Sequence, residues 1–331
     1  GCQLAANPLK RPIPHMVWPV PPEIPRIQFI NSVSGPFDLG IQKILFEKFY
    51  AYLAGKEEVF ITGPYGLEMD RSGNLYVVDT FPGFVHVFNP GEKTYYRFPK
   101  DGERLQSPID VAVDTTTGTV YVTDSKDKTV KIYKDFGKRF AGDLGRGIFE
   151  RPTGVAINPI TSELLVVDTL SSNIVRYSLN GHQLKGFYGT HGNGDGQLHY
   201  PTNIFTSPDG KIIVSDSLNF RVQVFSSHGN FISKFGKRGN RPGQFSRPRG
   251  VAKDSAGNIY VVDALFDIVQ IFNNKGRLLL DFGGPGHDFG KFWLPTGIYI
   301  DEKDYIYIAD SYNKRGQIFR YLQGKDKEAL Q

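Results

Sequence analysis

Pro201 to Gly250 reads PTNIFTSPDGKIIVSDSLNFRVQVFSSHGNFISKFGKRGNRPGQFSRPRG. A short apolar run follows Pro201, and apolar and polar residues then alternate over three segments, Lys211 to Ser217, Arg221 to Ser226 and Phe231 to Gly236. Alternation of this kind is typical of half-buried β-strands. Pro-Asp-Gly, Leu-Asn and His-Gly-Asn separate the segments, and such residues favour turns. The stretch therefore predicts four short strands within about 50 residues.

The second strand of this stretch recurs along the sequence. It appears as LYVVDT, VYVTDS, LLVVDT, IIVSDS, IYVVDA and IYIADS, whose aspartates are Asp79, Asp124, Asp168, Asp216, Asp263 and Asp310. Successive aspartates are 45, 44, 48, 47 and 47 residues apart. One four-stranded sheet cannot bury both of its faces, but a closed ring of such sheets can. The six units therefore predict an all-β fold, a six-bladed β-propeller.

Four motifs recur in these units: P-x-G-[VI]-x-x-[DN], G-x-[IL]-Y-V-x-D-[TS], x-[VI]-Q-[VI]-F and F-G-x-x-G-x-x-x-G-Q-F. On these residues the protein resembles the NHL-repeat family of six-bladed propellers, over roughly residues 62–321. The resemblance implies the fold. It leaves the function open, because the family fold hosts scaffolds, RNA binders and enzymes.

Composition narrows the classes of site that the protein can hold. The 331 residues include 25 Phe, 17 Tyr and a single cysteine, Cys2, with a formal net charge of +5. One cysteine excludes a disulfide framework, a cysteine-based zinc site and a C-x-x-C-H haem attachment. No run of residues approaches the roughly 20 apolar positions of a membrane-spanning helix. The mildly basic charge fits an anionic partner or surface without requiring one.

The beginning of the sequence predicts a tether. Gly1-Cys2 resembles the end of a bacterial lipobox, so Cys2 is a candidate lipid anchor; the alternative is a cysteine at an arbitrary boundary of the polypeptide. Residues 1–25 are rich in proline and predict an extended, polyproline-like segment, with Trp18 docked on the body. These features favour an exported lipoprotein, in the periplasm or on the cell surface, that is attached to a membrane only through its anchor.

Two segments precede the repeats. The last repeat lacks a fourth strand, so residues 26–35, and Arg26 to Val33 in particular, are expected to supply it and close the ring. Residues 36–61 contain a helical pattern from Gly40 to Gly55. This helix packs on the ring as a lid, or it exposes Phe46 and Tyr50 as a docking ridge. The propeller then spans residues 62–322, and residues 323–331 form a charged tail.

Strand direction reverses at each step within a blade. The loops between second and third strands, the connections between blades and the start of each inner strand therefore lie on one face, which we call the top face. Inner strands prefer glycine at the rim of the central channel, but blades 2 and 4 carry Asp110 and Asn203 there. These two side chains can bind a cation such as Ca²⁺, a water cluster or a ligand hydroxyl, or they bond neighbouring backbone N–H groups.

The six repeated aspartates are expected to have a structural role, because an identical residue in every blade most simply repeats one local task. Arg221 and Arg315 are expected to support two of them. The connection between blades 4 and 5 concentrates positive charge, as a solvated loop or as a patch for an anionic partner. This candidate basic patch consists of Lys237, Arg238, Arg241, Arg247 and Arg249.

Two classes of function remain. The first is a scaffold for protein–protein interaction on the top face, with no nucleic-acid partner and no cofactor. Resemblance to NHL proteins of metal-reducing bacteria adds an accessory role in a multihaem cytochrome assembly. The alternative is a metal-dependent, lactonase-like hydrolase using Glu68, Asp110 and Asn203 at the channel mouth. The spacing of Glu68 differs from that of Asp110 and Asn203, no histidine falls on a predicted inner strand, and no nucleophile elbow or phosphate-binding loop occurs.

Overall fold

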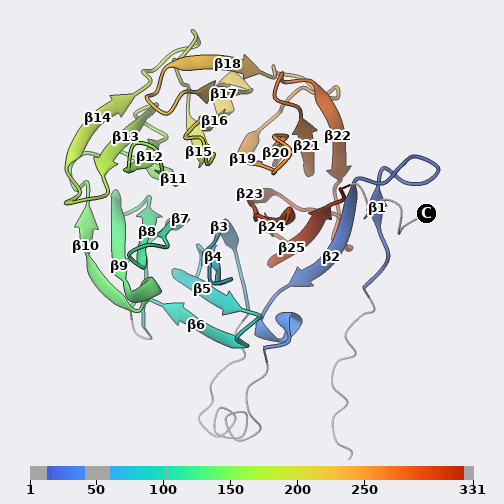
Figure 1. Cartoon of the computed structure of the whole chain (residues 1–331), viewed down its shortest axis with the longest axis horizontal. Helices are drawn as coiled ribbons and strands as arrows, with labels where there is room; N and C mark the ends of the chain where they lie inside the picture. Colours follow the sequence, from blue (N-terminus) through green and yellow to red (C-terminus); the bar gives the residue numbers. More distant parts are fainter. Residues whose placement is uncertain (1–12, 42–59, 101–102, 324–331) are drawn as a thin grey trace, which may run out of the picture.

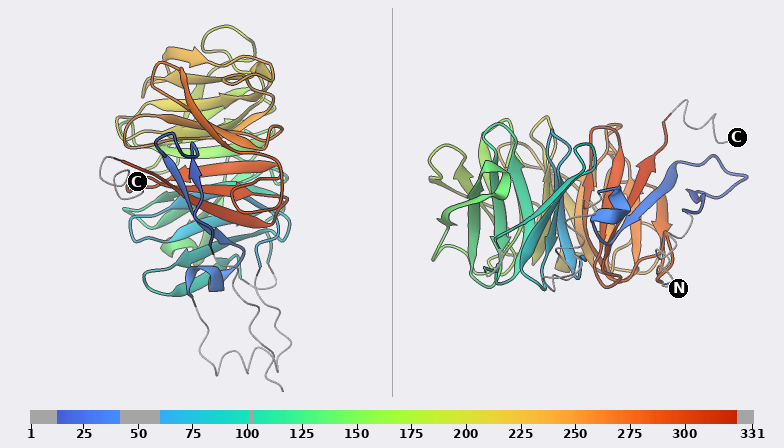
Figure 2. Two further views of the ribbon diagram at one scale, coloured as in Figure 1. Left: turned by 90° about the vertical axis from the view of Figure 1, so that its right-hand side faces the viewer. Right: turned by 90° about the horizontal axis from the view of Figure 1, so that it is seen from below.

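A computed structural model gives the fold and describes residues 13–41, 60–100 and 103–323. Six antiparallel sheets stand around a central axis, each with its first strand innermost (Figure 1). This is the predicted all-β six-bladed propeller, and seen from its side it is a thick disc (Figure 2). In blades 1 to 5 every residue of the second strand is buried, because each blade packs both of its faces against its neighbours.

The strands follow sequence order within the blades. Blades 1 to 3 contain β3 (Pro64–Met69), β4 (Leu75–Asp79), β5 (Phe84–Asn89) and β6 (Thr94–Phe98); β7 (Pro108–Asp114), β8 (Thr119–Asp124), β9 (Thr129–Lys134) and β10 (Arg139–Leu144); and β11 (Pro152–Asn158), β12 (Glu163–Asp168), β13 (Asn173–Ser178) and β14 (Leu184–Tyr188).

Blades 4 to 6 continue the pattern. They contain β15 (Pro201–Thr206), β16 (Ile212–Asp216), β17 (Arg221–Phe225) and β18 (Phe231–Phe235); β19 (Pro248–Lys253), β20 (Ile259–Asp263), β21 (Ile268–Phe272) and β22 (Leu278–Gly283); and β23 (Pro295–Ile300), β24 (Tyr305–Asp310), β25 (Arg315–Tyr321), β2 (Ile27–Val33) and β1 (Val17–Trp18).

Blade 6 closes the ring with an N-terminal strand, as predicted. Strand β2 pairs antiparallel with β25, from Ile27 opposite Tyr321 to Val33 opposite Gly316. The tether prediction needs a correction, because β1 adds a fifth strand outside β2. Residues 17 and 18 therefore belong to the propeller and not to an extended spacer.

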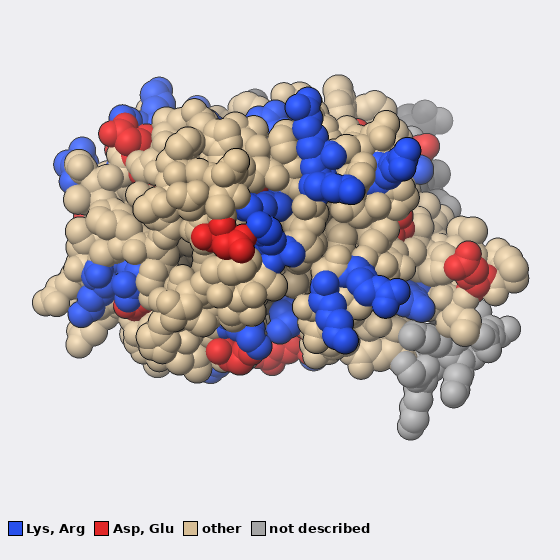
Figure 3. All heavy atoms as spheres, turned by 90° about the horizontal axis from the view of Figure 1, so that it is seen from above, with Lys and Arg blue, Asp and Glu red and all other residues tan. Residues whose placement is uncertain are grey.

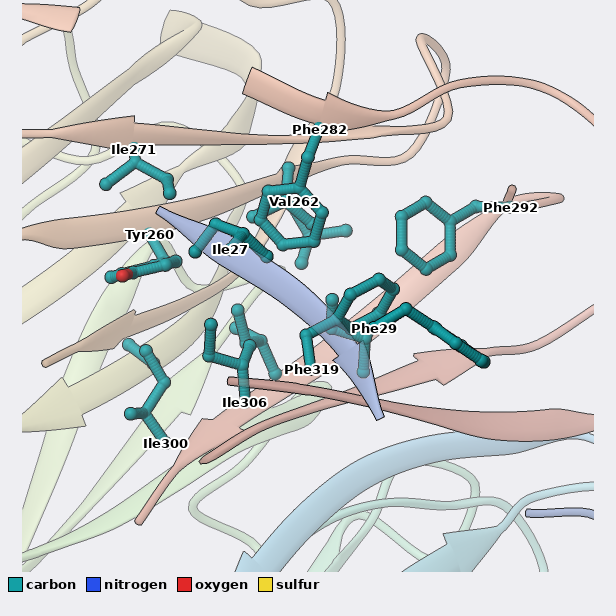
Figure 4. Packing of buried hydrophobic residues seen from close by; sticks show 14 residues of the cluster. Ile27, Phe29, Tyr260, Val262, Ile271, Phe282, Phe292, Ile300, Ile306 and Phe319 are labelled. Carbon is teal, nitrogen blue, oxygen red and sulfur yellow. The ribbon is translucent and has the colours of Figure 1, made fainter. Parts of the chain in front are cut away.

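Aromatic packing holds this N-terminal segment in place. The Trp18 ring lies 5.9 Å from Phe282 and 5.8 Å from Phe319, measured between ring centroids, so the predicted docking of Trp18 on the body is confirmed. Ile27 and Phe29 enter the core between blades 5 and 6 (Figure 4). Burying side chains of this size stabilises the closed ring by about 1.5 to 3 kcal/mol each.

Adjacent blades are also joined by hydrogen bonds near the axis. The residue after the repeated aspartate carries a hydroxyl in five blades, and each hydroxyl donates to the carbonyl of the proline that begins the next inner strand. The pairs are Thr80 with Pro108, Ser125 with Pro152, Thr169 with Pro201, Ser217 with Pro248 and Ser311 with Pro64. Blade 5 has Ala264 at this position. We call these contacts the hydroxyl latches.

Helical structure in the described residues is limited to the 3₁₀ turns η1 (Pro36–Leu39), η2 (Asp135–Gly137) and η3 (Ser217–Asn219). Within that same part of the protein, no helix is long and apolar enough to span a membrane. Cys2, the helix predicted around Phe46 and Tyr50, and the tail after residue 323 lie outside the described residues.

Candidate functional site: the top face and the channel mouth

The repeated aspartates are buried beneath the top face and hydrogen-bond the connections between blades. Asp79 accepts hydrogen bonds from the backbone N–H groups of Thr62 and Gly63 at 2.8 and 2.7 Å. Asp124, Asp168 and Asp263 each accept two equivalent bonds, and Asp216 and Asp310 each accept one. All six are fully buried. Each carboxylate thus holds the connection that leads into its own blade, which is the local role expected from the repeat.

Two of these carboxylates also have a buried arginine partner. Arg221 Nε donates to Asp216 at 2.7 Å, and Arg315 Nε donates to Asp310 at 2.8 Å. Arg221 further donates to the carbonyls of Asn193, Gly194 and Gln197 in the preceding connection. In blade 1 the position of this arginine is taken by Phe84, and Asp79 is instead contacted by His86 Nε2 at 3.1 Å, from the position that Gln223 occupies in blade 4. The carboxylates are therefore committed to structure and are not open to a ligand.

At the channel rim the inner strands lie so close together that several rim positions have room only for glycine. A Cβ at Gly66 would lie 2.3 Å from Asp110 Oδ1, and one at Gly297 would lie 2.1 Å from the Tyr65 carbonyl oxygen. Gly154 and Gly250 meet similarly close backbone atoms of the next blade. Close approach of the inner strands explains the glycine preference at the rim.

Asp110 and Asn203 close the space between these glycines. Asp110 Oδ2 accepts from Asn203 Nδ2 and from the Val155 backbone N–H, both at 3.2 Å. Asn203 Oδ1 accepts from the Val251 backbone N–H at 3.1 Å. Burial raises the pKa of Asp110 to about 7 although these hydrogen bonds act to lower it. Both side chains thus bond neighbouring backbone N–H groups, and they also bond each other.

Glu68 lies further along the inner strand of blade 1 and is half-buried. Burial, and next the nearby charge of Asp110, raise the pKa of this carboxyl well above its usual range. In the described structure, no hydrogen bond joins Glu68 to Asp110 or Asn203. Across the described ranges, no three or more His, Cys, Asp and Glu side chains gather in a way that could hold a metal ion.

Above the rim the channel opens into a small pocket, the mouth pocket, whose lining includes Tyr65, Asp110, Asn203, Arg249 and Thr296. Arg249 Nη1 donates to the Tyr65 hydroxyl at 2.7 Å, and the guanidinium carbon lies 5.5 Å from the centroid of the Tyr65 ring. Blade 5 is therefore connected to blade 1 across the top of blade 6. The sequence separation of 184 residues hides this contact from any local pattern.

The other residues of the basic patch are more exposed than Arg249. Lys237, Arg238, Arg241 and Arg247 are exposed, whereas Arg249 is half-buried. Arg238 lies over the Phe220 ring at 5.3 Å. Among the described residues, none of the five forms an ion pair with a carboxylate. On the side of the disc shown in Figure 3, Lys and Arg side chains occur in several groups with acidic residues between some of them.

Sequence reasoning missed a ring of exposed apolar residues on the top face. Five blades place a large apolar or aromatic side chain two residues after the repeated aspartate, and blade 2 has Lys126 there. These residues and their exposed fractions are Phe81 (75%), Leu170 (48%), Leu218 (43%), Leu265 (51%) and Tyr312 (53%). We call them the apolar ring. The signal lies in the repeat itself, because DTF, DTL, DSL, DAL and DSY share the apolar third letter.

Comparisons with known families agree with this architecture. The model of the NHL repeat matches residues 105–133, and that of a 6-bladed beta-propeller family, DUF5128, matches residues 195–265. The protein is a six-bladed propeller with an NHL repeat. Solved structures extend the likeness of this NHL-type propeller to most of its length, at a level of identity that shows the fold alone.

Among solved structures, an auxiliary nutrient binding protein from Bacteroides thetaiotaomicron has a TM-score of 0.62 and 17% identity, covering 80% of this protein and 70% of its own length. Virginiamycin B lyase from Staphylococcus aureus has a TM-score of 0.58 and 14% identity, covering 79% and 96%. Enzymes and a binding protein thus share the fold, so the function has to come from the site.

Two curated relatives match parts of the propeller. Protein STRICTOSIDINE SYNTHASE-LIKE 2 of Arabidopsis thaliana is 31% identical over 169 residues, which is 44% of each sequence. Protein brain tumor of Drosophila melanogaster is 30% identical over 134 residues, covering 39% of this protein and 12% of its own length. The matches therefore span less than half of either relative.

Proposed function

We propose that this propeller is a scaffold that docks a protein partner on its top face. The apolar ring carries the proposal. Exposed apolar side chains scattered singly are ordinary, but the same exposure at one repeat position in five of six blades forms a patterned surface. Aromatic side chains and arginine are enriched among the residues that provide most of the binding energy at protein interfaces, and the ring contains Phe81 and Tyr312. Its three leucines add apolar area.

The basic patch supports the same face. Its five cations have no carboxylate partner in the described structure, so a partner can pair with them without breaking an existing ion pair. Charges of this kind mainly raise the association rate and set orientation, while the apolar ring supplies the buried area.

The proposal is tested with surface variants of the full-length protein. The double variant Phe81→Ser, Leu265→Ser removes two members of the apolar ring, and Ile160→Ser removes an exposed apolar residue from the β11–β12 loop on the opposite face. Native complexes are isolated by chemical cross-linking and the linked positions are mapped by mass spectrometry. We expect cross-links on the top face that the double variant loses and Ile160→Ser keeps; cross-links confined to another face would refute the proposal.

Export, lipid attachment at Cys2 and association with a multihaem cytochrome are the finer part of this proposal. They are supported by the Gly1-Cys2 pair, the proline-rich N-terminal segment and the family resemblance. Intact-mass analysis of protein from the native membrane fraction tests the anchor, since acylation adds a defined mass. A haem absorption band in the cross-linked complex tests the partner.

A lactonase-like site is less well supported by the geometry. Asp110 and Asn203 direct side-chain atoms to each other and to backbone N–H groups, and within the described structure Glu68 is not hydrogen-bonded to either. A hydrolase would need all three to turn toward one ion. The scaffold is therefore the function that the top face supports best.

A further inference from the structure

The mouth pocket is lined by one positively charged side chain, Arg249, whose position is fixed within the protein. Arg249 is held by its hydrogen bond to the Tyr65 hydroxyl, and its guanidinium carbon lies 5.5 Å from the centroid of the Tyr65 ring. A guanidinium has five N–H donors, and the described residues use one of those of Arg249. The remaining donors and the positive charge stand at the entrance of the channel, half-buried and without a carboxylate partner in the described structure. An arginine in this state suits an anionic group supplied from outside.

The acidic residue of the same pocket does not neutralise Arg249. The carboxylate of Asp110 accepts hydrogen bonds from Asn203 and from the Val155 backbone N–H. Within the described residues, Asp110 and Arg249 form no ion pair, although both line the pocket. Burial keeps the pKa of Asp110 near 7, so this group carries only part of a negative charge at neutral pH. The entrance of the pocket therefore remains positive.

The size of the pocket limits the group that can enter. The inner strands approach so closely at the rim that even a Cβ at Gly66 or Gly297 would overlap neighbouring atoms. Because the pocket is small and the strands around it are tightly packed, we expect the tip of one side chain to enter it, and not an aromatic ring or a peptide segment. A carboxylate is planar, small and able to pair with a guanidinium through two parallel hydrogen bonds.

The surface around the mouth pocket indicates which other residues a ligand would carry next to that carboxylate. The apolar ring lies on the same face in blades 1, 3, 4, 5 and 6, and Lys237, Arg238, Arg241 and Arg247 stand on one connection only. A matching ligand therefore has large apolar residues beside its carboxylate and additional acidic residues on one side.

We propose that the partner of the top face is a peptide segment that places a carboxylate against Arg249 in the mouth pocket and rests neighbouring apolar residues on the apolar ring. The carboxylate comes from an Asp or Glu side chain or from the carboxyl terminus of the partner. This inference rests on the proposed docking function. It adds the chemistry of the partner and the residue of the propeller that binds the partner's carboxylate. Arg249 is the specificity-determining contact, and the apolar ring provides area.

The experiment uses the full-length protein and a displayed library of random 12-residue peptides. Selected peptides are synthesised and their affinities measured by calorimetry. We expect enrichment of Asp or Glu next to Phe, Trp or Leu. Replacing the acidic residue of the peptide by its amide, or Arg249→Gln in the protein, is expected to weaken binding by about 10- to 100-fold, the range for a charge-assisted hydrogen bond. Combining the two changes should add little further loss.

Matched variants keep the result specific. Arg249→Lys keeps the charge and loses the planar fork, so an intermediate loss is expected. Arg277→Gln, which changes an exposed arginine in the β21–β22 loop on the opposite face, should bind like the unaltered protein. Circular dichroism and the thermal midpoint establish that Arg249→Gln is folded. A folded Arg249→Gln with full affinity, or selected peptides without acidic residues, would overturn the inference.

The two proposals fail in different ways. If peptides and native partner lose binding in Phe81→Ser, Leu265→Ser but bind Arg249→Gln normally, docking on the top face stands and the carboxylate inference falls. If a selection yields no peptide whose binding depends on either set of residues, the inference also falls. If cross-links of the native partner map to another face, the docking proposal itself falls.

Discussion

Asn203 Nδ2 of blade 4 donates to Asp110 Oδ2 of blade 2 at 3.2 Å, so two blades that are not neighbours are hydrogen-bonded across the channel. Between them, the Val155 backbone N–H of blade 3 donates to the same oxygen at the same distance. Three of the six inner strands are thereby joined through one buried carboxyl group. Its ionisation should be visible in the stability of the whole ring.

Burial raises the pKa of Asp110 from its usual 3.8 to about 7. Between these values the folded protein holds a proton that the unfolded polypeptide has lost. The contribution of Asp110 to stability is therefore greatest near pH 4, and it falls as pH rises to 7, by up to about 1.4 kcal/mol per pH unit. Urea denaturation from pH 4 to pH 8 should show the stability of Asp110→Asn rising relative to the unaltered protein over this interval.

A control separates titration from lost packing. Asn158→Ala removes a buried amide that does not titrate, so its effect should be the same at every pH. A constant difference between Asp110→Asn and the unaltered protein would contradict the raised pKa.

Gly297→Ala should destabilise the ring by about 1 to 3 kcal/mol, because its Cβ would lie 2.1 Å from the Tyr65 carbonyl oxygen and the inner strands would have to separate. Gly316 lies in the same blade, and a Cβ there would meet its nearest atoms at 3.9 Å. Gly316→Ala should therefore change the free energy of unfolding by no more than about 0.5 kcal/mol. Equal losses in the two variants would show that the rim has room to relax.

The hydroxyl latches predict effects of opposite sign in two blades. Ser125→Ala removes the hydrogen bond to Pro152, whose length is 2.6 Å, and should cost about 1 kcal/mol. Ala264→Ser restores the hydroxyl at the position where blade 5 lacks one, facing Pro295. It should stabilise the protein by about 0.5 to 1 kcal/mol. Denaturant midpoints measure both; a loss of stability in Ala264→Ser would mean that the blade 5 to blade 6 contact has a different geometry.

Arg221→Met should cost about 3 to 5 kcal/mol, because Asp216 would stay buried without its charged partner and three carbonyls of the preceding connection would each lose one hydrogen bond. The matched change is Lys234→Met in the same blade, which breaks an exposed ion pair with Asp195. That variant should lose less than about 1 kcal/mol. Thermal unfolding of the two variants under the same conditions measures both losses of stability. Similar losses would show that removing one positive charge explains the effect, without a contribution from burial.

The repeat made most of the fold predictable. Each aspartate recurs with the same neighbours, so its hydrogen bonds to the connection before it follow from local sequence. Ring closure by residues 26–33 was also predictable, because the last repeat lacked a strand and an unpaired edge needs a partner. Strand β1 was not predictable, since two residues among prolines show no alternation.

The candidate site was less accessible to sequence reasoning. Arg249 was identified as one of five basic residues. Its contact with Tyr65 was not predictable, because the two residues belong to blades 5 and 1, which are adjacent in space to blade 6 and far apart in sequence. The apolar ring was overlooked because strand-level alternation draws attention to buried positions. Its residues lie in turns, where an apolar side chain has no periodic neighbour to mark it.

Pairing between β2 and β25 also constrains how the molecule is made. Residues 27–33 leave the ribosome early, and the strand they pair with ends at residue 321. During synthesis β2 remains without its partner β25 until nearly all of the remaining propeller has emerged. Contacts this distant in sequence slow folding and leave strand edges exposed in the meantime. The pairing that completes the ring is thus also one of the last contacts that can form after synthesis begins.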